Sequence, residues 1–380
     1  MISTGERWTS FLIGSMDTYP LEQLDLEGAK KLQFRLVDAI ARHFDGPSFL
    51  QAGEYGIWAE IGRPQSTARV EAVLADFFGV EEVCLVRGAG TGALRSVLMA
   101  ALKPGQKLLV HDAPIYPTTL VTVNAMGLRL VPIDLNDPVA LDELEFEDIE
   151  VALVQHARQR FEDRYVLDDV IKTLRKQSIG LTVIVDDNYV VMRVPKIGVE
   201  LGADVSTFSL FKLLGPEGLG CILTNSGLAD RIRKDNYSGG TQVQGPEALE
   251  ALRALVYAPV AFAIQSEVVQ EVVTYLNSSQ VPGVVQAYRA NAQSCVILVE
   301  LEGLRAEDVL RKSVQFGAAS HPVGAESRYE VLPLFYRVSG TFRQENPGLA
   351  ERMIRINPMR AGSDLVIDIL TKSLRACQGE

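Results

Sequence analysis

Seven short apolar runs, separated by stretches with helical spacing, constrain the fold of this chain more than any other feature. These β-branched runs lie at 83–87, 107–112, 128–134, 151–157, 181–187, 205–210 and 219–225. Strands that alternate with helices favour parallel pairing, because each helix returns the chain to the same edge of the sheet. Runs without polar alternation indicate strands that are buried on both faces. We therefore predict an α/β domain with a mostly parallel seven-stranded sheet and helices on both faces.

A smaller α/β domain is expected to follow this sheet. Beyond a helical stretch near 245–278, apolar runs alternate again with helix-like segments, at 294–303, 306–314, 329–340, 353–358 and 363–377. The opening sixty residues show no clear periodicity and are expected to wrap around other parts of the chain. The predicted division is an N-terminal segment at 1–50, a large domain at 51–265 and a small domain at 266–380.

The composition restricts the partners of this chain. With 380 residues, of which 47% are hydrophobic, the chain is long enough for two cores, and its net charge of -11 disfavours nucleic acid. The four cysteines lie far apart and lack metal-ligand spacing, so neither a disulfide framework nor a metal site is expected. No signal-peptide pattern opens the sequence, and no continuous apolar run reaches about 18 residues. We expect a soluble, cytoplasmic protein that is not bound to a membrane.

A glycine-rich turn, GAGTGALRS at 88–96, lies between the first predicted strand and a predicted helix at 92–103. The free backbone N–H groups and the positive end of a helix favour phosphate binding at such a turn. The glycine spacing matches neither the dinucleotide fingerprint GxGxxG nor the nucleotide-binding P-loop. Taken alone, the pattern fits a plain strand-to-helix turn equally well.

Two carboxylates follow another predicted strand, in the segment VIVDDNY at 183–189. Functional groups in open α/β sheets lie at the carboxyl ends of the strands, where Asp186 and Asp187 fall. A carboxylate at this place can pair with a protonated ring nitrogen of a ligand. A helix cap or a solvated strand end would also explain a single aspartate.

A lysine in an apolar setting follows the next predicted strand, in the segment FSLFKLLGPEGLG at 208–220. Most lysines are solvated surface charges, whereas Lys212 has large apolar neighbours on both sides. An apolar setting favours the neutral, nucleophilic amine over the ammonium ion. A structural lysine would fit the same pattern, so this residue gains meaning only together with the other two motifs.

These three motifs, in this order, resemble those of the fold-type I enzymes that depend on pyridoxal 5'-phosphate (PLP), the aspartate aminotransferase superfamily. The resemblance covers most of residues 50–380 and is strongest in GTGALR, VDDNY and SxxKxxGPEGLG. It implies that PLP is the cofactor and that Lys212 binds it as a Schiff base. It also implies that Gly90 and Thr91 hold the cofactor phosphate and that Asp186 pairs with the pyridine nitrogen.

The same resemblance places further residues around the cofactor ring. Asn188 occupies the position of a compact residue that backs the ring. Because Asn is larger than the residue usually found there, Asp187 remains an alternative to Asp186 as the partner of the ring nitrogen. Tyr116 is expected to stack on the ring, since aromatic stacking contributes about 1 kcal/mol beyond area burial. A tyrosine beside a proline is also a common packing residue, which is the alternative for Tyr116.

Polar residues near two strand ends complete the predicted cofactor site. The segment QHAR at 155–158 resembles the QxSR segment of cystathionine-synthase-like relatives. It makes Gln155 and His156 candidates for contact with the cofactor and Arg158 a candidate for contact with the substrate. Ser209 resembles a serine that touches the phosphate. A hydrogen-bonded histidine at a strand end and a turn hydroxyl are the structural alternatives for His156 and Ser209.

Two arginines are candidates for binding groups other than the cofactor ring. Arg355, in the segment MIRINP, resembles the RxN arginine of aminotransferases, and its planar guanidinium suits the carboxylate of an amino acid. Arg63, in EIGRPQST, resembles an arginine that reaches the cofactor phosphate of a neighbouring subunit. This implies a homodimer with shared active sites. No second arginine pair in the sequence points to a dicarboxylic substrate.

The motifs favour more than one reaction on an amino acid. GTGALR and RIN resemble aminotransferases, whereas GRPQST and QHAR resemble the cystathionine synthase and lyase group. We favour an aminotransferase, with a Cβ or Cγ lyase or synthase as the alternative. A non-catalytic protein of the same fold is a further alternative, against which the presence of all three motifs counts. A dinucleotide-binding protein would leave Lys212 without a role.

Overall fold

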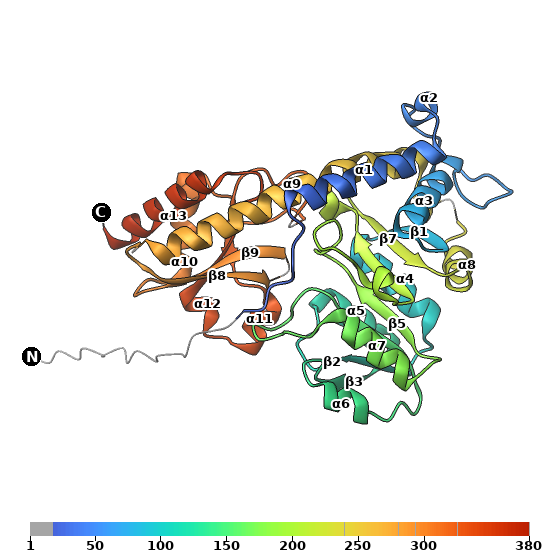
Figure 1. The fold of residues 1–380 in the computed structure, drawn as a ribbon, viewed down its shortest axis with the longest axis horizontal. Helices are drawn as coiled ribbons and strands as arrows, with labels where there is room; N and C mark the ends of the chain where they lie inside the picture. The colour runs from blue at the N-terminus through green and yellow to red at the C-terminus, as the bar shows by residue number, and fades with distance from the viewer. Residues whose placement is uncertain (1–17, 239, 280, 293, 325, 380) are drawn as a thin grey trace, which may run out of the picture.

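The chain forms two α/β domains joined by one long helix (Figure 1). The structure is a computed structural model that describes residues 18–379, apart from 239, 280, 293 and 325. The larger domain contains a seven-stranded sheet of β1 (Glu82–Arg87), β2 (Lys107–His111), β3 (Arg129–Ile133), β4 (Ile149–Gln155), β5 (Thr182–Asp186), β6 (Val205–Ser209) and β7 (Leu219–Thr224). All seven strands lie where the apolar runs predict them.

The strand order in this sheet is β1-β7-β6-β5-β4-β2-β3. Neighbouring strands from β6 to β3 pair in parallel, whereas β7 pairs antiparallel with both β1 and β6. Alternate strand residues enter cores on opposite faces, as Val83 and Leu85 do on one face and Cys84 and Val86 on the other. The predicted mostly parallel sheet with helices on both faces is therefore confirmed.

Helices cover both faces of the large sheet. They are α1 (Leu26–His43), α2 (Gly46–Phe49), α3 (Gln65–Phe78), α4 (Ala89–Ala101), α5 (Pro117–Met126), α6 (Pro138–Glu143), α7 (Leu167–Gln177), α8 (Ser226–Asp235) and α9 (Gly245–Ser278), with short 3-10 helices η1 (Gly198–Leu201) and η2 (Phe211–Leu213). Helix α1 lies along α9, as Figure 1 shows, and buries Leu36 and Ala39 in the large core.

The smaller domain follows α9 and contains a second sheet. Its elements are β8 (Val284–Ala292), β9 (Ser294–Leu301), α10 (Ala306–Ser313), η3 (Val314–Phe316), β10 (Leu334–Arg337), α11 (Gly340–Glu345), α12 (Leu349–Arg352), β11 (Met353–Asn357) and α13 (Ser363–Gln378). The strand order is β10-β11-β9-β8, with antiparallel neighbours throughout. Helices α10 and α13 pack against each other and bury apolar residues of this sheet.

Helix α9 belongs to both cores. Its buried residues up to Phe262 pack in the large domain, and those from Val268 onward pack in the small domain. The boundary predicted at 265 therefore falls inside a continuous helix. By length and composition alone α9 is apolar enough to cross a membrane, while 56% of its most apolar window is buried inside the protein. Polar residues such as Gln265 and Ser266 interrupt its apolar sequence.

Candidate active site

A cavity of about 260 Å³ lies at the carboxyl ends of the parallel strands and contains Lys212. The β1–α4 turn, the ends of β4 and β5, helix η2 and the start of α5 contribute its walls. Its described lining residues are Gly90, Thr91, Leu94, Tyr116, Pro117, Thr118, Thr119, Gln155, Asp186, Asn188, Tyr189 and Lys212. The structure thus brings together the three motifs that the sequence places on separate strands.

The glycine-rich turn places the start of α4 at this cavity. Gly88 has a φ of 93° and precedes the first residue of the helix, a backbone conformation that favours glycine. A Cβ atom on Gly90 would lie 2.4 Å from Oδ1 of Asn188, so the turn can approach the β5 end only with glycine at this position. Gly90 and Thr91 therefore present the first turn of α4 to the cavity.

The carboxylate of Asp186 is buried and held in place by neighbouring amides. The backbone N–H and Nδ2 of Asn188 donate hydrogen bonds to its Oδ1, at 3.0 and 2.6 Å, and Nε2 of Gln155 donates to its Oδ2 at 3.3 Å. Burial raises the pKa of Asp186, while the two bonds from Asn188 and the charge of Lys212 act in the opposite direction. Asp186 is the aspartate of the pair that faces the cavity.

Asp187 is buried elsewhere. Its carboxylate accepts hydrogen bonds from Nδ1 of His156, at 2.6 Å, and from the backbone N–H of Gly198, at 3.1 Å. Consecutive residues of an extended chain point to opposite sides, so Gln155 faces the cavity and His156 faces Asp187. The geometry therefore favours Asp186 over Asp187 and does not place His156 at the predicted cofactor site.

Lys212 lies beside an aromatic residue to which the sequence assigns no role. Its Nζ is 3.8 Å from the centroid of the Tyr189 ring and 3.5 Å from Oδ1 of Asn188. Tyr189 has a φ of 70°, an uncommon conformation for a residue other than glycine. The motif VDDNY contains this tyrosine, but only the fold reveals that its ring lies under the lysine amine.

Two buried hydroxyl groups near the cavity have no hydrogen-bond partner among the described residues. They are the OH of Tyr116, which precedes α5, and the Oγ of Ser209, at the end of β6. Burial raises the pKa of Tyr116 well above its usual range, so its hydroxyl stays protonated. The backbone N–H of Ser209 donates to Oδ1 of Asn188 at 3.0 Å, which places this residue next to the described lining.

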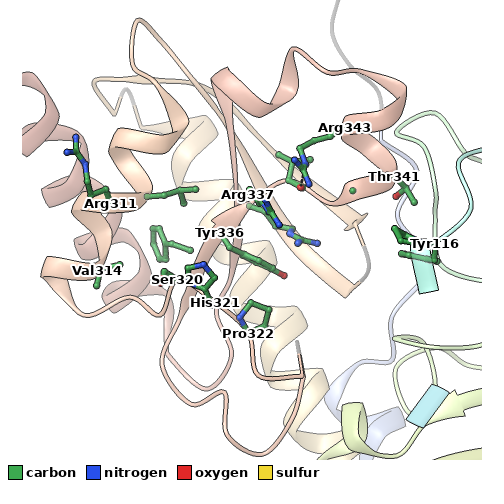
Figure 2. Close-up of a pocket in the computed structure, with 16 residues that line it drawn as sticks. Tyr116, Arg311, Val314, Ser320, His321, Pro322, Tyr336, Arg337, Thr341 and Arg343 are labelled. Atoms are coloured by element: carbon green, nitrogen blue, oxygen red, sulfur yellow. Dashed lines mark hydrogen bonds between the residues drawn. The ribbon is translucent and has the colours of Figure 1, made fainter. Parts of the chain in front are cut away.

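A second cavity, of about 800 Å³, adjoins the first one and is lined mainly by residues of the small domain. Tyr116 and Pro117 line both cavities. Arg355 of β11 lines the larger one, and its Cζ lies 3.8 Å from the centroid of the Tyr336 ring. Figure 2 shows Tyr116 at one side of this cavity, beside Thr341 and across from Tyr336 and His321. The predicted substrate arginine therefore lies in a cavity that shares the wall formed by Tyr116 and Pro117 with the Lys212 cavity.

Besides His156 and Ser209, two arginines among the predicted site residues lie outside both cavity linings. Arg158 donates hydrogen bonds to the backbone oxygens of Tyr19 and Tyr165, at 3.1 and 2.7 Å, and so attaches the chain before α1 to the large domain. Arg63 forms an ion pair with the buried Glu71 at 2.6 Å within its own subunit. Neither arginine contacts the Lys212 cavity in this chain.

These residues fit PLP in chemical type. Lys212 offers an amine, Asp186 a buried carboxylate for the ring nitrogen, and the first turn of α4 a phosphate site. The hydroxyls of Tyr116 and Ser209, which have no partner among the described residues, would be satisfied by hydrogen bonds to the cofactor, since buried polar groups are usually paired. Among the described residues, no group of three or more potential metal ligands occurs.

Comparison with known proteins assigns the same chemistry to the chain. Residues 64–251 match the family model of the class V aminotransferases, and residues 270–370 match that of the YhfS-like C-terminal domain. The protein YhfS of Escherichia coli strain K12 is 51% identical over 360 residues, which cover 94% of this chain and 99% of that protein.

Solved structures give a similar result. A crystal structure of the PLP-dependent protein YhfS from Escherichia coli has a TM-score of 0.92 at 51% identity, covering 95% of this chain and 100% of that one. A cystathionine γ-lyase from Lactobacillus plantarum, complexed with L-serine, has a TM-score of 0.71 at 16% identity and covers 91% of this chain and 99% of that one. At this identity the second likeness shows the fold alone.

The fold, the cavity and these relatives define a PLP-dependent enzyme of fold type I. Its cofactor is PLP, as the resemblance of the three motifs implies. Within this class, the chain belongs to the YhfS family.

Proposed function

We propose that this protein is an aminotransferase that acts on an amino acid. The observation that carries the proposal is that the cavity with Arg355 and the cavity with Lys212 adjoin each other, since Tyr116 and Pro117 line both. An amino acid whose carboxylate binds Arg355 would extend past Tyr116 toward Lys212. The match of residues 64–251 to the class V aminotransferases supports this choice of reaction.

Each residue of the site has a defined task in this proposal. PLP, when bound, supplies an electron sink for negative charge at the substrate Cα. Asp186, held by Asn188, keeps a proton on the ring nitrogen. The Nζ of Lys212 accepts the proton from the substrate Cα. The guanidinium of Arg355 fixes the carboxylate of the substrate and thereby its orientation.

A lyase or synthase that acts at Cβ or Cγ is the second candidate, and one observation favours it. The hydroxyl of Tyr116 is buried, unpartnered among the described residues and protonated, and it lies where the two cavities meet. Such a hydroxyl can donate a proton to a group that leaves the substrate side chain. Elimination would use the same Lys212 and Arg355 as transamination.

The first test is the visible absorption of the purified protein with PLP. We expect wild type to bind the cofactor with an absorption band that Lys212→Ala loses or shifts, because this lysine forms the covalent bond. Amino acids that bind Arg355 should change the band of wild type. A protein without any such band after incubation with PLP would contradict the assignment of Lys212.

A second test separates the two reactions. Wild type is incubated with an amino acid that changes its absorption, in the absence of any oxo-acid acceptor. Transamination should give one equivalent of oxo acid per subunit and no free ammonia, whereas elimination should release ammonia continuously. Tyr116→Phe distinguishes the roles further, since it should abolish elimination and leave the proton transfer by Lys212 in place.

We also propose that the protein is a cytoplasmic homodimer. The segment before α3 carries exposed apolar side chains, which favour a contact with another subunit. They are Tyr55, Ile57, Trp58 and Ile61. Light scattering of the purified protein tests this state. The predicted contact of Arg63 with a partner's cofactor phosphate would require competition with the Glu71 ion pair.

A further inference from the structure

The larger cavity contains more positive charge than one substrate carboxylate requires. Besides Arg355, its walls include Arg337 at the end of β10 and Arg343 of α11. Figure 2 shows these two arginines extending into the same space, across from Tyr116. All three arginines therefore line one cavity, and Arg337 and Arg355 come from the neighbouring strands β10 and β11.

Two members of this cluster, Arg337 and Arg343, form no ion pair among the residues that the structure describes. Among the described residues that line the cavity, none is an aspartate or a glutamate. Arg337 has no ion-pair partner in the described part of the chain, and Arg343 donates its Nε only to the backbone oxygen of Val338, at 3.0 Å. Burial, together with the charges of Arg337 and Arg355, lowers the pKa of Arg343. A bound anion would relieve this repulsion.

We propose that Arg337 and Arg343 form a second anion subsite, which binds an acidic side chain of the substrate. The inference rests on the proposed function, in which Arg355 binds the α-carboxylate. Guanidinium groups suit planar carboxylates and tetrahedral phosphonates or phosphates alike, so the shared chemistry is a terminal oxyanion. The substrate class is therefore an amino acid with a negatively charged side chain, which the arginine spacing in the sequence does not reveal.

Binding of unreactive acids to the PLP-loaded enzyme tests the subsite by calorimetry. Glutarate carries a carboxylate at each end, whereas pentanoate has the same five carbons with a methyl group at one end. Neither has an amine, so the result does not depend on transamination. We expect glutarate to bind at least about tenfold more tightly than pentanoate, as hydrogen bonds to charged groups would give. If 4-phosphonobutyrate binds still more tightly, the terminal group is a phosphonate or phosphate; if less tightly, it is a carboxylate.

Variants assign this preference to particular side chains. Arg337→Gln and Arg343→Gln should each lower the ratio of the glutarate affinity to the pentanoate affinity toward one. The affinity for pentanoate itself should stay unchanged. Arg343→Lys should retain part of the preference. Arg311→Gln is the matched control, because Arg311 lines the same cavity but is 72% exposed and paired with Asp308 at 2.6 Å. Equal binding of the acids to wild type, or an unchanged preference in Arg337→Gln, would overturn the proposal.

Discussion

Asn188 connects three groups of the candidate site. Its Nδ2 donates to Asp186, and its Oδ1 accepts from the backbone of Ser209 and lies 3.5 Å from Nζ of Lys212. Asn188 is larger than the residue usually found at this position in the enzymes that the motifs resemble. Its longer side chain can reach all three groups. The amide also fills the space that Gly90 leaves open, so its orientation is fixed by packing as well as by hydrogen bonds.

The buried carboxylate of Asp186 gives a prediction that depends on pH. Burial raises its pKa in the folded protein, so the ionised group costs folding free energy above that pKa. The cost begins to fall as the pH drops through the raised pKa and is gone below the ordinary value of 3.8. In the cofactor-free protein, Asp186→Asn should therefore melt at a higher temperature than wild type at neutral pH, and the difference should shrink as the pH is lowered toward that ordinary value. Thermal melts across this range measure both.

Asp187→Asn is the control for this experiment. It removes an acceptor from His156 and Gly198 and should lower the melting temperature, since it leaves buried donors unpaired. With PLP bound, Asp186→Asn should lose its reaction with amino acids and Asp187→Asn should keep it. The opposite pattern would assign the ring nitrogen to Asp187.

At the scale of elements, the turn between β1 and α4 determines how closely the phosphate site can approach the β5 end. Gly90 is in contact with the Asn188 side chain, and Gly92 leaves no room for a Cβ atom, which would lie 2.0 Å from the backbone oxygen of Arg87. The glycines of this turn are thus required by close packing. This explains the motif without reference to any spacing rule.

Gly90→Ala tests that explanation. The added methyl group would displace Asn188 and should destabilise the protein by about 1–3 kcal/mol, the usual cost of overpacking. The affinity for PLP should fall as well, because Asn188 holds Asp186. Gly180→Ala is the matched control, since nothing lies within 4 Å of its added Cβ. Urea denaturation and titration with PLP measure the two effects; equal behaviour of both variants would contradict the packing argument.

The sequence predicts elements well where burial is complete and poorly where it is partial. The strands of the large sheet are buried on both faces, so their apolar runs stand out. Helix α1 buries only one narrow face, including Ala29 and Leu36, and β8 carries polar residues such as Gln286 and Arg289. β8 therefore gives no clear alternating signal. In α1, however, the buried residues Ala29, Leu36, Ala39 and Ile40 do recur at helical spacing, so the prediction that the opening sixty residues lack periodicity is wrong there.

The residues of the candidate site also include some that could be predicted from the sequence and some that could not. Lys212, Asp186 and the glycine-rich turn could be predicted because carboxyl ends of neighbouring parallel strands meet at one edge. The cluster of Arg337 and Arg343 with Arg355 could not, since it depends on how the small domain folds and docks against Tyr116. Arg158 and His156 show the reverse case, in which a motif is present but other contacts hold the side chains away.

At the scale of the whole molecule, a buried polar network joins the two domains. Arg193, from the large domain, pairs with Glu326 of the small domain, and its Cζ lies 3.7 Å from the centroid of the Phe262 ring. Nδ2 of Asn357 donates to Glu326 at 2.6 Å, and Gln265 of α9 donates to Asn357. Asn357 ends the strand that carries Arg355, so the network also helps to hold the arginine that we propose as the substrate ligand.

Glu326→Gln should destabilise the protein strongly. The substitution keeps the size of the side chain but leaves the buried guanidinium of Arg193 without a counter-charge, which typically costs about 3–5 kcal/mol. Glu250→Gln breaks the ion pair with Arg328, whose partners are 38% and 48% exposed, and should cost less than about 1 kcal/mol. Urea denaturation compares the two. Similar small effects would show that the network does not hold the domains together.

The long helix α9 also decides where the chain can be divided. Because its first part faces one core and its last part the other, a cut at 265 would leave each fragment with half a helix whose apolar side chains meet water. Neither fragment would then be an autonomous folding unit. An exchange of domains between relatives would therefore have to transfer α9 whole with one domain. The residues of the other domain that pack against α9 would have to be transferred with it.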